Sequence, residues 1–248
     1  MSIDVQNQTV LITGANRGIG KAILETAIAQ GAKKVYAAVR DPDSVAGLVA
    51  EHGDKIVPVT VDLQAPETIH DAAAVATDVN IVINNAGILR TNDVLSPEVF
   101  ADYEAEHQTN VLGWLHVAQA FAPVLKANGG GALVQLNSVV SIKSFSDFAS
   151  YSASKAASYS LTQALRDRLS DQHTAVVSVH PGPIKTDMAH NAGLEASADS
   201  PTVVAEAIFA ALREGRFHVF PDAMAKEFES AYQSYAQSVV EAEVTEPA

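Results

Sequence analysis

The chain has 248 residues, of which 48% are hydrophobic, and it contains no cysteine. This composition supports one or two α/β domains with a large core and excludes disulfides and thiolate chemistry. The net charge of −13 without a basic stripe disfavours nucleic-acid binding. No signal-peptide pattern, membrane-length apolar run or HExxH-type metal pair is present, so we expect a cytoplasmic protein without membrane or metal binding.

The first predicted unit is a strand, a glycine-rich turn and a helix. Residues 9–13 form an apolar β-rich run, Gly14 to Gly20 form the turn, and residues 21–30 show helical periodicity, ending at Gly31. Glycines let the backbone approach a phosphate, and a helix N-terminus presents free N–H groups to it. A glycine turn alone is a weak sign of a nucleotide site, but this one has the strand before it and the helix after it.

A second strand is predicted over residues 34–39, which completes a β-α-β unit. In dinucleotide folds an acid near the end of this strand binds the adenosine ribose and repels a 2′-phosphate. Here Val39 takes that place and Arg40 follows, and a guanidinium can bind a 2′-phosphate through charge-assisted bonds. Arg40 therefore favours NADP(H) over NAD(H), the alternative being an exposed loop charge. Arg17, inside the glycine turn, can approach the same phosphate from the other side. Asp41 is expected to start the turn that follows.

The rest of the chain alternates strands with helices. Further strands are predicted over 56–61, 81–83, 132–137, 175–180 and 217–220. Further helices are predicted over 66–78, from Ser96 with Pro97 at the first helical position to about 126, and over 149–170, 201–213 and 223–241. Pro58 lacks an N–H, so its strand should lie towards the outside of the sheet.

This alternation predicts an α/β single-domain Rossmann fold, a doubly wound parallel sheet of about seven strands flanked by helices. We expect a cofactor half over about 1–130 and a catalytic and substrate-binding half over about 131–248. Ligands bind beyond the carboxyl ends of such strands. Gly14, Asn84, Ser138 and Pro181 all fall there, on four different strands.

Tyr151 and Lys155 are four residues apart and therefore share one face of a predicted helix. A free tyrosine has a pKa of about 10. A neighbouring ammonium stabilises the phenolate, so Lys155 is expected to lower the pKa of Tyr151 into a range useful for proton transfer. Alternatively Tyr151 is a core aromatic residue and Lys155 a solvated charge.

The motifs together resemble the short-chain dehydrogenase/reductase family over roughly residues 9–187. The matching segments, in chain order, are Thr13-Gly14-x-x-x-Gly18-x-Gly20, Asn84-Asn85-Ala86-Gly87, Asn110-Val-Leu-Gly113, Ser138, Tyr151-x-x-x-Lys155, and Pro181-Gly182 followed by Thr186. Six motifs in the family's order form a specific signature. The chain departs from the family at Ser141, where many members have a small residue, and it lacks the common glycine-rich C-terminal ending.

The resemblance implies an NADP-preferring, carbonyl reductase-like enzyme that reduces a ketone or aldehyde reversibly by hydride transfer. Tyr151 would deliver the proton, Ser138 would donate a hydrogen bond to the carbonyl oxygen, and Lys155 would tune Tyr151 and bind the nicotinamide ribose. Asn110 would hold a water that links Lys155 to solvent. Asp62 would bind the adenine amino group, and its alternative is a simple turn acid.

The expected cofactor-binding residues are Gly14, Asn16, Arg17, Gly18, Ile19, Gly20, Arg40, Asp62, Leu63, Asn85, Ala86, Gly87, Tyr151, Lys155, Pro181, Gly182, Ile184 and Thr186. The expected substrate-binding residues are Ser138, Val140, Phe145, Phe148, Tyr151 and Met188. Trp114 is a further candidate, and the apolar members of this set can equally belong to the core. A mobile lid is expected over residues 188–200.

Two other functions stay open at this point. A 3-oxoacyl-carrier-protein reductase must dock an acidic carrier, which the net charge of −13 disfavours. A nucleotide-sensing regulator has no need of a proton donor, which the intact Ser138, Tyr151 and Lys155 set supplies. Small residues on the two long helices, at 118, 120, 122, 153, 156 and 157, predict a homodimer or homotetramer.

Overall fold

The computed structural model describes residues 1–242. Its strands are β1 (Thr9–Thr13), β2 (Lys34–Val39), β3 (Ile56–Thr60), β4 (Ile81–Asn84), β5 (Gly131–Leu136), β6 (Thr174–Val179) and β7 (His218–Val219). Its helices are α1 (Gly18–Ala29), α2 (Ala46–His52), α3 (Pro66–Val75), α4 (Val99–Glu106), α5 (Gly113–Ala127), α6 (Ala149–Leu169), α7 (Asp187–Asn191), α8 (Pro201–Glu214) and α9 (Ala223–Tyr235).

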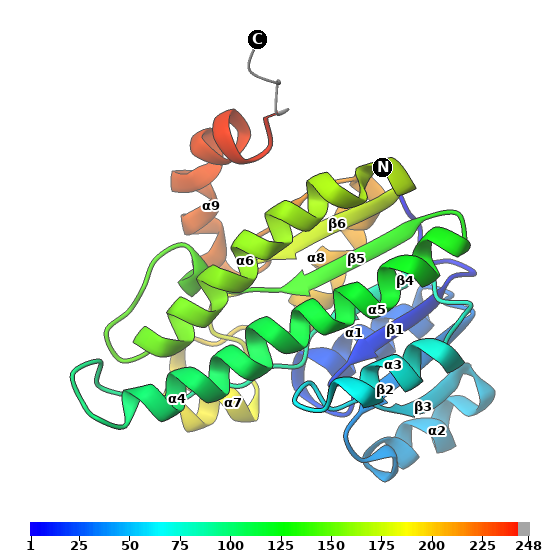
Figure 1. Ribbon diagram of the computed structural model, residues 1–248, viewed down its shortest axis with the longest axis horizontal. Helices are drawn as coiled ribbons and strands as arrows, with labels where there is room; N and C mark the ends of the chain where they lie inside the picture. The colour runs from blue at the N-terminus through cyan, green and yellow to red at the C-terminus, as the bar shows by residue number, and fades with distance from the viewer. Residues whose placement is uncertain (243–248) are drawn as a thin grey trace.

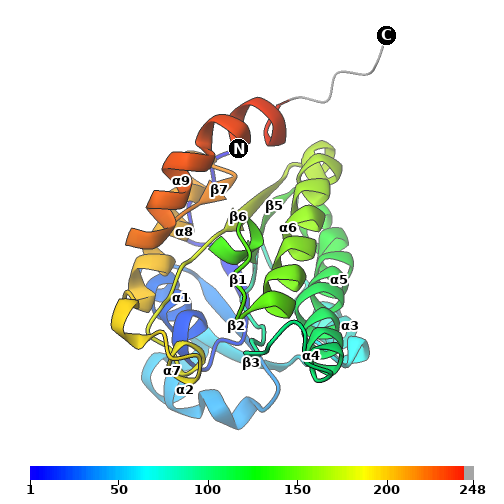
Figure 2. The same ribbon diagram turned by 90° about the vertical axis from the view of Figure 1, so that its left-hand side faces the viewer.

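The strands form one seven-stranded parallel sheet in the order β3-β2-β1-β4-β5-β6-β7. Helices cover both faces: α3, α5 and α6 lie on one side and α1, α2 and α8 on the other (Figures 1 and 2). The strand order reverses between β1 and β4, and ligands of such sheets bind at this switch point. The predicted Rossmann fold is confirmed.

Each face of the sheet has its own core. Val10 and Ile12 point to the α1 and α8 side, whereas Leu11 points to the α5 side. All five residues of β1 are buried, because helices cover both faces of a parallel sheet. The strand was therefore recognisable as a continuous apolar run.

Pro58 lies in β3, which is the outermost strand of the sheet, as predicted. The predicted start of the next long helix is wrong, because residues 96–98 form a turn and α4 begins at Val99. Asp93 holds this turn: its carboxylate accepts from the backbone N–H of Leu95 at 2.9 Å, and its carbonyl accepts from the N–H of Ser96 at 3.0 Å. The proline therefore closes a turn instead of opening a helix.

Two short helices, α2 and α7, were not predicted. Helix α7 occupies part of the segment expected to be a lid loop, and Thr186 caps it by accepting a hydrogen bond from the N–H of Ala189 at 3.3 Å. A short helix of this kind carries little sequence periodicity, and its cap is a local hydrogen bond. The small residue Ala118 also departs from expectation, because it is buried in the core, while Ala153 and Ala156 are exposed on α6.

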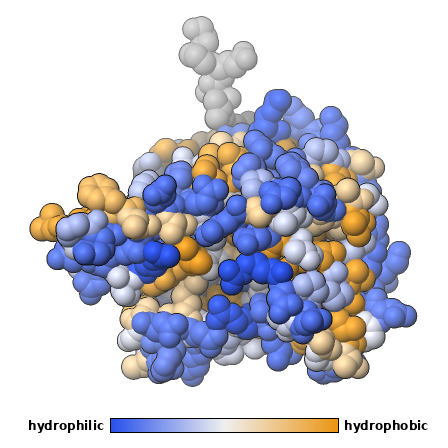
Figure 3. Space-filling view, turned by 60° about the horizontal axis from the view of Figure 1, so that its bottom comes forward, coloured by the Kyte–Doolittle hydropathy of each residue, from blue (hydrophilic) through white to orange (hydrophobic). Residues whose placement is uncertain are grey.

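The lobe formed by α4 and the loop before it carries exposed apolar side chains, at the left of Figures 1 and 3. Leu95 is 90% exposed and Phe100 is 78% exposed, and Val94 and Tyr103 lie beside them in the chain. A cluster of exposed large apolar side chains is typical of a contact surface.

Candidate active site

The glycine turn connects β1 to α1 at the switch point of the sheet. Gly14 and Gly18 have φ values of +66° and +53°, a region that side chains disfavour. A Cβ at Gly20 would lie 2.1 Å from the carbonyl oxygen of Gly14, so only glycine fits there. Arg17 stands at the N-cap of α1, and its side chain makes no capping bond. The first N–H groups of α1 are therefore not capped by a side chain, which suits a pyrophosphate.

The Thr13 hydroxyl ties this turn to the loop after β4. Its Oγ1 donates to Asn84 Oδ1 at 3.0 Å and accepts from the N–H groups of Asn85 and Ala86, both at 3.0 Å. Asn85 Nδ2 donates in return to the Thr13 carbonyl at 2.9 Å. These hydrogen bonds join the glycine-turn motif to the Asn84–Gly87 motif.

A wide helical turn over His107–Leu112 joins α4 to α5 and carries Asn110 inward. Asn110 Oδ1 accepts from the N–H of Ile88 at 2.9 Å, and its Nδ2 donates to the Ile88 carbonyl at 2.9 Å and to Ser154 Oγ at 3.0 Å. A Cβ at Gly87 would lie 2.9 Å from Asn110 Oδ1 and 3.7 Å from Lys155 Nζ. Asn110 and Lys155 therefore lie close to the same point at Gly87, and Asn110 also holds the loop after β4, while its water-binding role stays a prediction.

Ser138, Tyr151 and Lys155 come together at the carboxyl end of β5, and all three are buried. Ser138 Oγ donates to the Pro181 carbonyl at 3.2 Å and accepts from the N–H of Val140 at 3.3 Å. Lys155 Nζ donates to the Leu136 carbonyl at 2.7 Å and lies 5.7 Å from the centre of the Tyr151 ring. Tyr151 and Lys155, which share one face of α6, are both buried, so the alternative that Lys155 is a solvated charge is wrong.

The electrostatics differ from the sequence-based expectation for Tyr151. Burial raises the pKa of the Tyr151 hydroxyl above its usual range, and the Glu106 carboxylate raises it further, while a hydrogen bond with Ser138 opposes both. The predicted lowering of the Tyr151 pKa by Lys155 is therefore wrong for this structure. Burial lowers the pKa of Lys155 to about 8, against the opposing effect of the Glu106 carboxylate. Tyr151 is thus protonated at neutral pH, which is the form of a proton donor.

The segment after β6 closes the site from the other side. The Pro181 carbonyl accepts from the N–H of Val139 at 3.0 Å, and the N–H of Gly182 donates to Asp222 Oδ2 at 2.7 Å. A Cβ at Gly18 would lie 3.0 Å from Thr186 Cγ2. The structure therefore brings Thr186 against the glycine turn, and Ile184 is buried just before it.

Two arginines were predicted to bind a 2′-phosphate, and the structure treats them differently. Arg17 forms an ion pair with Asp187 at the start of α7. Arg40 directly follows β2 and is exposed. It lies near the glycine turn, because the N–H of Gly14 donates to the carbonyl of Ala38 at 2.8 Å. Within residues 1–242 Arg40 forms no ion pair, and Asp41 instead accepts from the N–H of Asp43 at 3.1 Å.

The other residues predicted to bind the cofactor lie in the glycine turn and in the segment after β3. Asn16 and Ile19 are half-buried in the glycine turn. Asp62 follows β3, and its Oδ1 accepts from the N–H of Gln64 at 3.0 Å, while Leu63 is buried against Gly113. These residues, the glycine turn and the α1 N-terminus fit a dinucleotide. Within residues 1–242 no group of three or more His, Asp or Glu side chains could hold a metal ion.

The predicted substrate-binding residues divide between the site and the core. Trp114 is fully buried in the core under α5, so it is not a pocket residue. Phe145 is 39% exposed on the loop before α6, where Lys143 Nζ lies 5.5 Å from its ring centre. Val140, Phe148 and Met188 are half-buried. The structure leaves their role in binding a substrate as a prediction.

Two buried residues that the sequence analysis did not select lie next to the site. Glu106 is one turn before Asn110 on the same helix face, which is the signal that could have identified it. His180 directly precedes Pro181 and lies 3.1 Å from the Ser138 carbonyl and 3.0 Å from Ser141 Oγ. Ser141, a departure from the family, therefore serves as the partner of His180.

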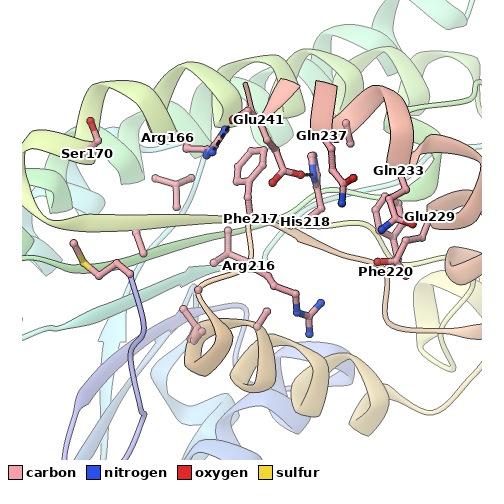
Figure 4. A pocket seen from close by; sticks show the side chains of 18 of the residues that line it. Arg166, Ser170, Arg216, Phe217, His218, Phe220, Glu229, Gln233, Gln237 and Glu241 are labelled. Carbon is pink, nitrogen blue, oxygen red and sulfur yellow. Dashed lines mark hydrogen bonds and ion pairs between the residues drawn. The ribbon is translucent and has the colours of Figure 1, made fainter. Parts of the chain in front are cut away.

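A separate cavity of about 510 Å³ lies between α6, β7 and α9 (Figure 4). Its lining includes Arg166, Phe217, His218 and Glu241. His218 Nδ1 and Glu241 Oε1 form a hydrogen bond of 2.8 Å. Ser138, Tyr151 and Lys155 do not line it. The cavity therefore does not belong to the candidate active site.

The family of the chain follows from comparison with known proteins. Residues 8–196 match the model of the short chain dehydrogenase family. The chain is 34% identical to a short chain dehydrogenase from Burkholderia cenocepacia whose structure was solved in complex with NADP, with a TM-score of 0.86 over 98% of this chain and 100% of that one. The protein therefore belongs to the short-chain dehydrogenase/reductase family and is an oxidoreductase of that family.

Two further relatives define the range of this similarity. The 1-deoxy-11-beta-hydroxypentalenate dehydrogenase of Streptomyces avermitilis is 31% identical over 236 residues, covering 90% of this chain and 87% of the relative. A family member from Burkholderia phymatum, solved in complex with NAD, is 22% identical and shares the fold, with a TM-score of 0.83 over 99% of both chains. Within residues 1–242, no helix combines the length and apolar character of a membrane span.

Proposed function

We propose that this protein is an NADPH-dependent oxidoreductase that reduces a ketone or aldehyde to an alcohol, reversibly. The observation that carries the proposal is the meeting of Ser138, Tyr151 and Lys155 at the carboxyl end of β5, beside the glycine turn. Bound NADPH would supply the hydride to the carbonyl carbon. The residues of the chain would then supply the hydrogen bonds and the proton.

Tyr151 is the proton donor in this proposal. Its raised pKa keeps the hydroxyl protonated in the absence of substrate, and charge that develops on the carbonyl oxygen creates the acceptor for that proton. Ser138 can turn its hydroxyl from the Pro181 carbonyl, 3.2 Å away, to the same oxygen. Lys155, anchored on the Leu136 carbonyl, would bind the nicotinamide ribose and hold positive charge beside Tyr151.

The preference for NADPH rests on Arg40. Its guanidinium is exposed beside the glycine turn, with Asp41 engaged elsewhere, so a 2′-phosphate would find an available cation. Val39, which stands where an NAD-specific acid would be, is buried and apolar. The similarity to a dehydrogenase solved with NADP supports the same preference.

The test is NADPH oxidation with a panel of ketones and aldehydes, followed by the same assay on Tyr151→Phe. This variant keeps the ring and removes the proton, so turnover should fall by at least about 100-fold while NADPH binding survives. Tyr235→Phe is the matched control, because Tyr235 is 56% exposed on α9. NADPH binding without oxidation across the panel would favour the regulator instead, and a Tyr151→Phe variant within a few-fold of the parent would refute the assignment of the proton donor.

A further inference from the structure

Glu106 is fully buried, and among the described residues 1–242 it is the acid whose charge acts on the proposed proton donor, Tyr151. A buried carboxylate is costly unless hydrogen bonds satisfy it. The apolar core cannot stabilise this carboxylate, so its hydrogen-bond partners must do so.

The two oxygens of Glu106 join two different segments. Oε1 accepts from the backbone N–H of Arg90 at 2.7 Å, in the loop that follows β4. Oε2 accepts from Ser150 Oγ at 2.6 Å, in the first turn of α6 and directly before Tyr151. One side chain thus ties α4, the loop and the helix that carries the proton donor.

The neighbouring contacts define the ionisation of Glu106. Ser150 Oγ accepts from Asn92 Nδ2 at 2.7 Å, so its proton is directed to Glu106. The Arg90 N–H can only donate. Both carboxylate oxygens therefore act as acceptors, which favours the ionised form, whereas burial raises the pKa of Glu106 and opposes it.

We propose that Glu106 is a positioning residue, whose buried carboxylate locks the first turn of α6 to the loop after β4 and sets the charge around Tyr151 and Lys155. The proposal deepens the proposed function and rests on it.

The negative charge of Glu106 acts on both Tyr151 and Lys155. The Glu106 carboxylate raises the pKa of Tyr151 and of Lys155, and therefore favours the protonated form of each. The other charged groups that face Glu106 are Asp102 on its own helix and Arg90 on the loop, which pair with each other at 2.9 Å. That pair is nearly neutral as a unit, so Glu106 carries the net charge of the cluster.

The first experiment measures NADPH affinity against pH, by fluorescence titration, for the parent and Glu106→Gln. Lys155 binds the cofactor in the proposed function, so affinity should weaken as Lys155 loses its proton near pH 8. Glu106→Gln keeps the size and removes the charge, so this midpoint should move down by about one pH unit. Glu104→Gln, an exposed acid on the same helix, is the control and should leave the midpoint in place.

The second experiment separates the charge from the hydrogen bonds. Ser150→Ala removes the bond and keeps the charge, so turnover should fall about 10-fold through misplacement of Tyr151, with the midpoint unchanged. Glu106→Asp keeps the charge, so the midpoint should stay near that of the parent even where turnover falls. These two variants carry the test if Glu106→Gln does not fold.

The outcomes distinguish the inference from the proposed function. A Glu106→Gln variant with the midpoint and turnover of the parent, or one that changes only the melting temperature, overturns the role of Glu106. A parent that binds NADPH with a midpoint near pH 8 but reduces no carbonyl compound overturns the proposed function, while a lowered midpoint in Glu106→Gln would still support the electrostatic role.

Discussion

The cofactor preference is a prediction whose size can be worked out from two arginines. Arg40 is exposed, forms no ion pair within residues 1–242, and borders the glycine turn. A charge-assisted hydrogen bond to a phosphate contributes about 1.5–3 kcal/mol. Arg40 alone therefore predicts a preference for NADPH over NADH of roughly 10- to 150-fold in kcat/KM.

Arg17 adds less than the sequence alone would indicate, because it is already paired. Its side chain and that of Asp187 are 67% and 69% exposed, and an exposed pair of this kind is worth at most about 1 kcal/mol. Binding of a 2′-phosphate would exchange one anionic partner for another. Asp187→Asn should therefore improve kcat/KM for NADPH by about 5-fold at most, without changing that for NADH.

The assay compares kcat/KM for NADPH and NADH with one good carbonyl substrate in the parent, Arg40→Ala, Asp187→Asn and Val39→Asp/Arg40→Ile. The parent should favour NADPH, Arg40→Ala should lose most of that preference, and the double variant should favour NADH, because the new carboxylate repels the phosphate and binds the ribose hydroxyl. Lys21→Ala, an exposed cation on α1, is the control. A parent that favours NADH, or an Arg40→Ala variant with an unchanged ratio, would show that Arg40 is only a surface charge.

Three further predictions follow from the site and the core. Lys155→Ala should lower turnover at least about 100-fold and also weaken NADPH binding in a direct titration; unchanged affinity would contradict the second role of Lys155. Burial and the neighbouring His218 lower the pKa of His180 to about 3. Between pH ~6.5 and 3 the unfolded chain therefore binds a proton at His180 that the folded chain does not. The free energy of unfolding should fall over this range as the pH falls, by up to roughly 1.4 kcal/mol per pH unit. Urea unfolding should show this slope in the parent and a shallower one in His180→Gln, and equal slopes would refute the attribution. Light scattering should find at least a dimer at micromolar concentration, through the exposed small residues of α6, and a monomer would contradict the predicted assembly.

The sequence predicted those parts of the protein that depend on local pattern. The alternation of strands and helices predicted the doubly wound sheet. A strand that is buried on both faces is a continuous apolar run, whereas a helix that is buried on one face shows helical periodicity. Pro58 predicted an outer strand from its missing N–H, and the structure confirms it. The spacing from Tyr151 to Lys155 placed both on one face of a helix from geometry alone.

The electrostatics of the site could not be predicted from the same pattern. The ammonium of Lys155 and the phenol of Tyr151 are neighbours, yet burial and Glu106 raise the pKa of Tyr151 instead of lowering it. A pKa depends on solvation and on charges from every element packed around the group, and these are brought together only by the fold. Glu106 is separated from Tyr151 by 45 residues of chain, so no local motif links them.

The sequence by itself determined the class of fold, which residues lie at the carboxyl ends of the strands, and the residue types available for chemistry. Tertiary structure alone decided which of those residues meet. It brought Thr186 onto Gly18 and paired Arg17 with Asp187, and it placed Trp114 in the core. The physical reason is that periodicity records the burial of one element, whereas a site is made by side chains from several elements whose distances are fixed by packing.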